Sequence, residues 1–471
     1  MTPSEQKYSC RSSIALLMQV KVGLVVDGIL DASVLRSKYA QLVELWPVLG
    51  GKLLSKSDSR RFQCGSTVDF ESRKVAEDLA TFLPFSWSGS TSSPSVLLED
   101  SSGVDRKFEF GVASTSMTIS KLRVTNLNDA TLLWFSVCHG LCDGKGLYDI
   151  IRYFCDLLSN KPVPKFILPP DATGGRMSDL VRDNRGKQAA ETLVQGTSNP
   201  DTFVSSHLTA LKLSLKFTLE TLLSSVGLAQ KLTDRLVYLP GSWVDEVRSR
   251  AQKELQCGSS EFQGVQLTRN DIITALYLRL VYGARGASNK PVDYIGPINY
   301  RGLLEAPEPD TYYAHNSVIL LLCLFSEHEL RTHSIARVAA RIRLATMQYR
   351  QPAVVKHELR LLEDKALAPA MRDIRGSIQW GNAMVSPWTT FEYTSLDFSG
   401  AVNEGHAYDE GHVPSVVFVN PSVSPMFASF PSPFAITVKN GAGGYWLRGA
   451  NTKRGWEHFE LLTSMDTLFC T

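Results

Sequence analysis

The sequence lacks an excess of charge of either sign. Across its 471 residues, 49 lysines and arginines stand against 47 aspartates and glutamates, which leaves a formal net charge of +2. No segment carries the dense block of basic side chains that a nucleic acid partner requires. We therefore expect no nucleic acid partner.

Long apolar runs are also missing. The longest strongly apolar stretch, Val318 to Phe325, is far shorter than the run of about 20 residues that a membrane-spanning helix needs. The first residues show no basic segment followed by an apolar core, which is the pattern of a secretion signal. We expect a chain that neither spans a membrane nor is secreted by a signal peptide.

Cysteine is sparse and its spacing holds no CxxC pair. The eight cysteines are scattered along the chain, which is typical of free thiols in a reducing compartment, so we expect a cytoplasmic protein. Cys138, His139 and Cys142 come close together, but adjacent residues that leave a strand point to opposite faces and no second ligand pair exists. We expect no metal site.

What remains is an ordinary globular composition, 44% hydrophobic and 20% charged, with a length that predicts two or three domains. Helical and strand-like periodicities alternate along both halves, which indicates an α/β protein with mixed sheets. Between Lys161 and Phe203 the apolar periodicity gives way to prolines and glycines. We therefore predict an N-terminal domain over 1–205, with a crossover connection at about 161–205, and a C-terminal domain over 206–471.

Local signals locate four elements in the first half. Asp31 is a good N-cap for a helix that ends at Trp46-Pro47, and Val48 to Leu54 is predicted to begin a second strand. The apolar, β-rich run Thr131 to Cys138 predicts a buried strand, and the helical spacing from Leu147 onward predicts a helix after it. In the second half, a long amphipathic helix is predicted over about 207–231.

The candidate catalytic residue is His139, at the end of the predicted buried strand. It opens the glycine-rich turn His139-Gly-Leu-Cys-Asp143-Gly, and α/β folds expose functional side chains at such positions. Gly140 and Gly144 permit close backbone approach by a ligand. An HxxxD spacing alone is equally compatible with a structural histidine in a tight turn.

The sequence does not support two other kinds of site, a phosphate-binding loop and a serine hydrolase. The segment Gly140 to Gly146 is one residue short of a phosphate-binding loop and has glycine where the magnesium-binding serine or threonine belongs. No G-x-S-x-G elbow occurs, so a serine hydrolase mechanism has no support.

The turn at His139 resembles the HxxxDG motif of the BAHD acyltransferases, a CoA-dependent family. Other segments resemble family motifs in the same order along nearly the whole chain, most closely as in the fungal branch with its trichothecene acetyltransferases. These segments are Trp46 to Leu53, Thr268 to Ala275, Ile298 to Arg301, Tyr313 to Asn316, Ser386-Pro-Trp388 and Asp397-Phe-Ser-Gly-Ala401.

The resemblance implies a fold of two similar chloramphenicol-acetyltransferase-like domains with mixed sheets and a channel between them. Part of 386–430 is then expected to pack on the N-terminal sheet. The implied reaction is transfer of an acyl group from acyl-CoA, as co-substrate with no bound cofactor, to a hydroxyl or amine of a small specialised metabolite. A monomer is expected.

The resemblance also implies roles for individual residues. His139 is expected to act as general base, and Trp388 or its neighbour to donate a hydrogen bond to the tetrahedral oxyanion. Asp143 is expected to pair with Arg301 and hold the histidine turn, and Asp397 to support the loop of the C-terminal motif.

The sequence departs from the family at the C-terminal motif, where a tryptophan and one glycine are lost. We expect Gly400 to leave a wider or more mobile channel wall there. An alternative function on the same fold is a non-CoA cyclase or dehydratase that uses His139 as acid or base. A pure binding protein is disfavoured because His139 and Asp143 would then be accidental.

Overall fold

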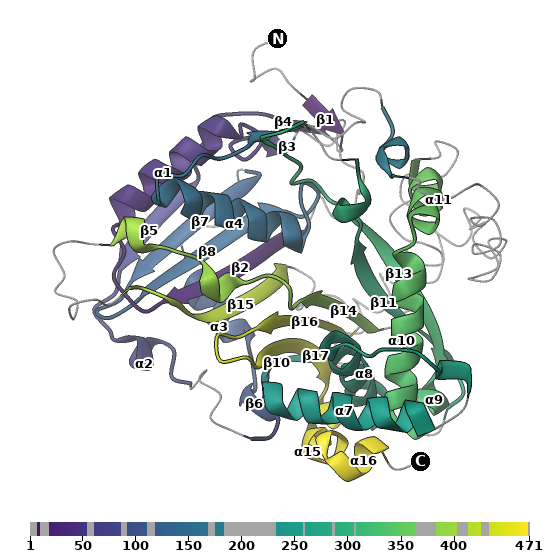
Figure 1. Cartoon of the computed structure of the whole chain (residues 1–471). Coiled ribbons are helices and arrows are strands. Elements are labelled where there is room, and N and C mark those ends of the chain that lie inside the picture. Colours follow the sequence, from purple (N-terminus) through teal and green to yellow (C-terminus); the bar gives the residue numbers. More distant parts are fainter. Residues whose placement is uncertain are drawn as a thin grey trace, which may run out of the picture.

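Two mixed β-sheets, each covered by helices, make up most of the molecule (Figure 1). Two mixed sheets agree with the α/β architecture expected from the sequence. The computed structural model describes residues 7–9, 18–53, 61–85, 92–110, 118–167, 175–182, 232–257, 260–284, 288–305, 308–363, 383–402, 413–424 and 433–469. The helix predicted over 207–231 and most of the predicted crossover connection lie outside them, so the domain boundary stays a prediction.

The first sheet has five strands in the order β15-β2-β8-β7-β5. Its central strand β8 is buried along its whole length, as the run of apolar residues predicts. The strands are β15 (Val416–Ser424), β2 (Gln19–Val26), β8 (Thr131–Cys138), β7 (Ser120–Asn126) and β5 (Phe70–Lys74).

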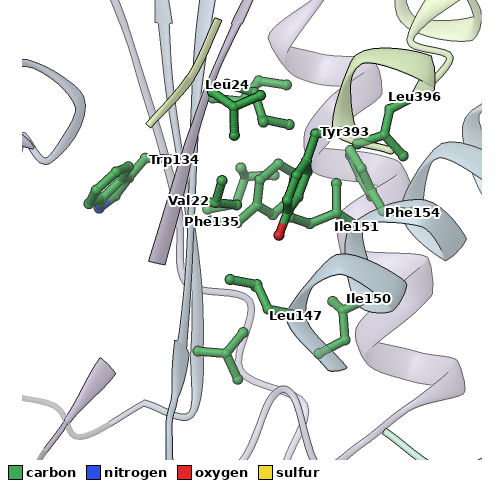
Figure 2. Packing of buried hydrophobic residues seen from close by; sticks show 14 of the residues in the cluster. Val22, Leu24, Trp134, Phe135, Leu147, Ile150, Ile151, Phe154, Tyr393 and Leu396 are labelled. Carbon is green, nitrogen blue, oxygen red and sulfur yellow. The ribbon is translucent and has the colours of Figure 1, made fainter. Parts of the chain in front are cut away.

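Helices α1 (Ala32–Leu45) and α4 (Gly144–Leu158) cover one face of this sheet (Figure 1). Asp31 caps α1, as predicted, by accepting hydrogen bonds from the backbone of Ser33 and Val34. Apolar side chains of α4 at helical spacing pack against β2 and β8 (Figure 2). On the opposite face, α3 (Ser102–Phe108) packs on β7 and β8.

The second sheet has seven strands in the order β13-β11-β14-β16-β17-β10-β6. Its outer face packs on α7 (Gly241–Cys257), α8 (Arg269–Tyr282) and α10 (Ile335–Tyr349). The strands are β13 (Val318–Ser326), β11 (Pro291–Asn299), β14 (Ala383–Trp388), β16 (Phe434–Lys439), β17 (Tyr445–Thr452), β10 (Leu232–Leu239) and β6 (Ser95–Leu98).

Two segments lie in the sheet of the other half of the chain. Strand β15, from the C-terminal half, pairs antiparallel with β2, and β6, from the N-terminal half, pairs antiparallel with β10. The inner face of the seven-stranded sheet shares a continuous apolar core with the five-stranded sheet, including Leu236, Ile436 and Trp446. The two halves are therefore interlocked rather than merely in contact.

The remaining elements are short connections around the sheets. The second predicted strand is shorter than expected, since β3 spans only Lys52–Leu53. It joins a small sheet with β1 (Lys7–Ser9) and β4 (Arg61–Gln63), and β9 (Lys165–Phe166) pairs with β12 (Thr311–Tyr312). The other helices are α2 (Leu79–Phe82), α9 (Glu327–Thr332), α11 (Pro352–Glu363), α14 (Lys453–Glu457), α15 (Phe459–Thr463) and α16 (Met465–Phe469), and the 3-10 turns include η8 (Arg301–Leu303) and η10 (Ser399–Ala401).

Candidate active site

His139 directly follows β8 and is held there by its own backbone, whose N–H donates to the carbonyl of Met18 at 2.9 Å. Its Nδ1 lies 3.1 Å from the carbonyl oxygen of Cys142. Because a carbonyl oxygen can only accept, Nδ1 carries the proton and Nε2 carries the lone pair. Burial lowers the pKa of His139 below its ordinary value of 6.5, so the imidazole is neutral at neutral pH.

The segment just before β13 holds the turn that follows His139. The side-chain amide of Asn316, just before β13, donates to the carbonyls of His139 at 2.7 Å and Gly140 at 3.2 Å. The backbone N–H of Asn316 donates to the carbonyl of Leu141 at 3.1 Å. Sequence reasoning placed Asn316 in a family segment but gave it no role; the structure makes it an anchor of the histidine turn.

Asp143 lies at the N-terminus of α4 with both carboxylate oxygens engaged. Its Oδ1 accepts from the backbone N–H of Gly146 at 2.9 Å, which caps the helix. Its Oδ2 accepts from Arg301 Nη1 at 2.9 Å and from the backbone N–H of Ser317 at 2.8 Å. The geometry brings Asp143 and Arg301 together.

The electrostatics of this pair follow from its burial. Burial alone would raise the pKa of Asp143, but the charge and hydrogen bond of Arg301, together with the backbone N–H groups of Ser317 and Gly146, outweigh it, so the pKa lies below its usual value. Arg301 also donates to the carbonyls of Tyr313, Ala314 and His315. The ion pair therefore joins the start of α4 to the segment that leads into β13.

Trp388, the last residue of β14, lies over the start of α4. A Cβ added to Gly144 would come within 2.6 Å of the indole ring, so this glycine permits close approach by Trp388. The indole Nε1–H donates to Ser386 Oγ at 3.1 Å. The ring also packs against Phe391 and Tyr393.

This arrangement points to a polar group, Ser386, that sequence reasoning placed in a family segment without a role of its own. Ser386 and Trp388 are two residues apart on β14, so their side chains share one face of the strand. Since Ser386 Oγ accepts from the indole, its own proton is available for donation. The sequence pointed to Ser386 only through the expectation that Trp388 or its neighbour donates a hydrogen bond to the oxyanion.

Asp397 and Gly400 lie at the other end of α4 from Asp143. The Asp397 carboxylate accepts from the backbone N–H of Ser399 at 2.9 Å and from Ser159 Oγ at 3.4 Å. A Cβ added to Gly400 would lie 2.1 Å from the carbonyl oxygen of Leu158. The glycine at this position allows the loop to pack against the backbone at the end of α4.

The described residues hold neither a metal-binding cluster nor a membrane-spanning helix. They contain no group of three or more histidines, cysteines, aspartates or glutamates that could hold a metal ion. Within those same residues, no helix is both long and apolar enough to cross a membrane.

Comparison with known proteins gives relatives in sequence and several similar folds. No family model matches the chain. The chain is 37% identical to the acetyltransferase peniE of Penicillium patulum over 482 aligned positions, which cover 98% of this chain and 99% of the relative.

Two solved structures share the fold at low sequence identity. TRI101 of F. sporotrichioides, solved with coenzyme A and T-2, matches with a TM-score of 0.67 at 12% identity, over 96% of this chain and 97% of that one. Vinorine synthase matches with a TM-score of 0.58 at 12% identity, over 98% of this chain and 95% of that one.

Proposed function

The chain belongs to the fungal BAHD-type acyltransferases, and from this premise we propose that it transfers an acyl group from an acyl-CoA thioester to a hydroxyl of a small specialised metabolite. An amine acceptor would use the same chemistry. The observation that carries the proposal is a neutral histidine, protonated on Nδ1, at the end of β8 and close to the place where both sheets meet. The relative peniE bears the name acetyltransferase, and TRI101 was solved with coenzyme A.

In the proposed reaction, His139 is the general base. Nε2 takes the proton of the acceptor hydroxyl as its oxygen attacks the thioester carbonyl, and the resulting imidazolium is stabilised by the Cys142 carbonyl on Nδ1. The tetrahedral intermediate then collapses, the carbon–sulfur bond breaks, and the imidazolium returns its proton to the departing thiolate. The histidine ends the cycle neutral.

The oxyanion of the intermediate needs a donor that is in place before the reaction. We assign this role to the Ser386 hydroxyl, with Trp388 acting through it: the indole N–H donates to Ser386 Oγ and orients the hydroxyl proton away from the ring. Trp388 thus becomes a positioning residue in the proposal rather than the donor itself.

Asp143 and Arg301 support the site without touching substrate. Their ion pair, together with Asn316, holds the histidine turn at a fixed place relative to β13 and α4. Asp397 supports the loop at the far end of α4.

We also propose a domain division, an oligomeric state and a location for the chain. The chain divides into an N-terminal domain over 1–205 and a C-terminal domain over 206–471, with a channel between the two sheets. It acts as a monomer in the cytoplasm, with acyl-CoA as co-substrate and no bound cofactor.

The test is acceptor-dependent release of CoA thiol. Purified protein is incubated with acetyl-, butyryl- and hexanoyl-CoA, each with and without a panel of hydroxylated terpenoid and polyketide alcohols, and the ester is identified by mass. The proposal predicts thiol release that depends on an alcohol and matches ester formation in amount. Conversion of an alcohol without any acyl-CoA would instead support a cyclase or dehydratase and contradict the proposal.

A further inference from the structure

A buried arginine outside the proposed site connects the two sheets. Arg448, in the middle of β17, is 1% exposed. Its guanidinium donates to both oxygens of Asp105, at 2.7 and 3.0 Å, and through Nε to Asp234 at 2.9 Å. It also donates to Asn420 Oδ1 at 3.1 Å and to the carbonyl of Pro421 at 3.3 Å. A buried arginine with this many partners is fixed in one geometry.

The partners of Arg448 come from three elements, α3, β15 and β10. Asp105 belongs to α3, which follows β6 and packs on the five-stranded sheet, where Phe108 contacts Trp134 at 5.5 Å between ring centroids. Asn420 and Pro421 belong to β15, the C-terminal strand in the five-stranded sheet. Asp234 lies on β10, beside β17 in the seven-stranded sheet.

Further contacts make these groups one cluster. Asp105 accepts from Asn420 Nδ2 at 2.8 Å and from Ser422 Oγ at 3.0 Å. The carbonyl of Asp234 accepts from the backbone N–H of Ser101, just before α3, at 2.8 Å. One guanidinium therefore ties α3 and β15 to the seven-stranded sheet.

The strand register relates this cluster to the proposed oxyanion donor. Ser386 pairs with Ile436, and Ile436 pairs with Arg448, so the three residues form one row across β14, β16 and β17. Paired residues point to the same face of a sheet. Since Ile436 belongs to the core shared with the five-stranded sheet, Arg448 and Ser386 both lie on the face toward that sheet.

The same cluster connects to the strand that carries the histidine. Asn420 pairs with Gly23 on β2, and Gly23 pairs with Trp134 on β8, the strand that ends immediately before His139. The two groups of the proposed reaction thus sit on different sheets. At one place the sheets are joined by Asp143–Arg301 and by Trp388 on Gly144; the Arg448 cluster joins them at a second place.

We propose that Arg448 is a positioning residue that fastens α3 and β15 to the seven-stranded sheet and thereby fixes the placement of Ser386 relative to His139. Its catalytic consequence rests on the proposed function. The apolar core that the two sheets share is not directional, whereas the charge-assisted hydrogen bonds of Arg448 act in one geometry and thereby fix the mutual orientation of the sheets. A displacement of about 1 Å between reacting groups can cost on the order of 100-fold in rate.

The experiment compares Arg448→Met, Arg448→Lys and Asp105→Asn with the control Glu99→Gln. Glu99 is exposed and pairs with Arg235. Glu99 directly follows β6 and Arg235 lies on β10, next to β6 in the seven-stranded sheet. The control therefore removes a carboxylate without removing a partner of Arg448. Hydrogen exchange of 102–108 and 416–424 is measured together with kcat and KM per folded molecule.

We expect faster exchange in both segments and a kcat lower by about ten-fold or more in Arg448→Met and Asp105→Asn, with KM for acyl-CoA nearly unchanged. Arg448→Lys should recover part of kcat, and Glu99→Gln should match the wild type. If Arg448→Met does not fold, the exchange and kcat of Asp105→Asn test the proposal in its place. Unchanged exchange contradicts the fastening, and faster exchange with unchanged kcat contradicts the positioning role. A wild type that transfers no acyl group contradicts the proposed function instead, and exchange still tests the fastening.

Discussion

At the residue scale, the imidazole of His139 must be neutral to take a proton, and its surroundings favour that state. Burial lowers its pKa below 6.5, and the Cys142 carbonyl selects the tautomer with the lone pair on Nε2. The consequence is a specific pH dependence.

We predict that kcat/KM is constant above neutral pH and falls as pH drops through the pKa of His139, with a midpoint below 6.5. The sign follows because a base with a lowered pKa stays neutral, and therefore active, to lower pH. Steady-state rates between about pH 5 and pH 9 measure it. A midpoint above 6.5 would mean that burial does not control the group that titrates.

Substitutions can distinguish the role of Ser386, the proposed oxyanion donor, from that of Trp388, the proposed positioning residue. Ser386→Ala removes the proposed oxyanion donor and should lower kcat by about 100-fold, whereas Trp388→Phe keeps the ring on Gly144 and should cost less. Rates at saturating acyl-CoA distinguish the two. Equal losses would indicate that the indole itself is the donor.

Asp143 and Arg301 should behave as a coupled pair. Asp143→Asn or Arg301→Met alone leaves a buried charge without its partner and should lower the free energy of unfolding by about 3–5 kcal/mol. The double variant should lose less than the sum of the single losses. Urea denaturation of the four proteins gives the coupling, and strict additivity would refute it.

At the element scale, helix α4 organises the site because different loops pack at its two ends. Asp143, Gly144 and Trp388 meet at its N-terminus, while Gly400 packs against Leu158 at its C-terminus. The second contact is steric and therefore makes a prediction about stability rather than about chain-length preference.

Gly400→Ala should lower the free energy of unfolding by about 1–3 kcal/mol, because the new Cβ would meet a backbone carbonyl that cannot easily move. Gly302→Ala is the matched control, since a Cβ there meets no atom within 4 Å. Thermal unfolding measures both. The preference of Gly400→Ala among acetyl-, butyryl- and hexanoyl-CoA should stay as in the wild type. A changed preference would show instead that Gly400 lines the channel.

At the scale of the whole molecule, local patterns predicted more than long-range pairings. The strand at Thr131–Cys138 and the N-cap at Asp31 follow from periodicity and side-chain chemistry within a few residues. The pairing of Asp143 with Arg301 was implied by family motifs, and the structure places the two groups 2.9 Å apart.

What the sequence did not reveal depends on contacts between distant segments. Arg448 and Asp105 are 343 positions apart, and nothing in the local pattern of β17 indicates that its arginine is buried. The hydrogen bond from Trp388 to Ser386 depends on side-chain orientation, which periodicity does not fix. The packing of Gly400 on Leu158 likewise depends on how two segments that are distant in the sequence meet in the fold.

The central claim is that His139 is the base of an acyl transfer from acyl-CoA. The most direct measurement is the rate of acceptor-dependent CoA thiol release by His139→Ala relative to the wild type, at equal concentrations of folded protein. The account predicts a loss of about 10²–10⁴-fold with thermal unfolding little changed. A variant that keeps more than about a tenth of the wild-type rate would contradict it, because removal of a positioned general base costs more than that.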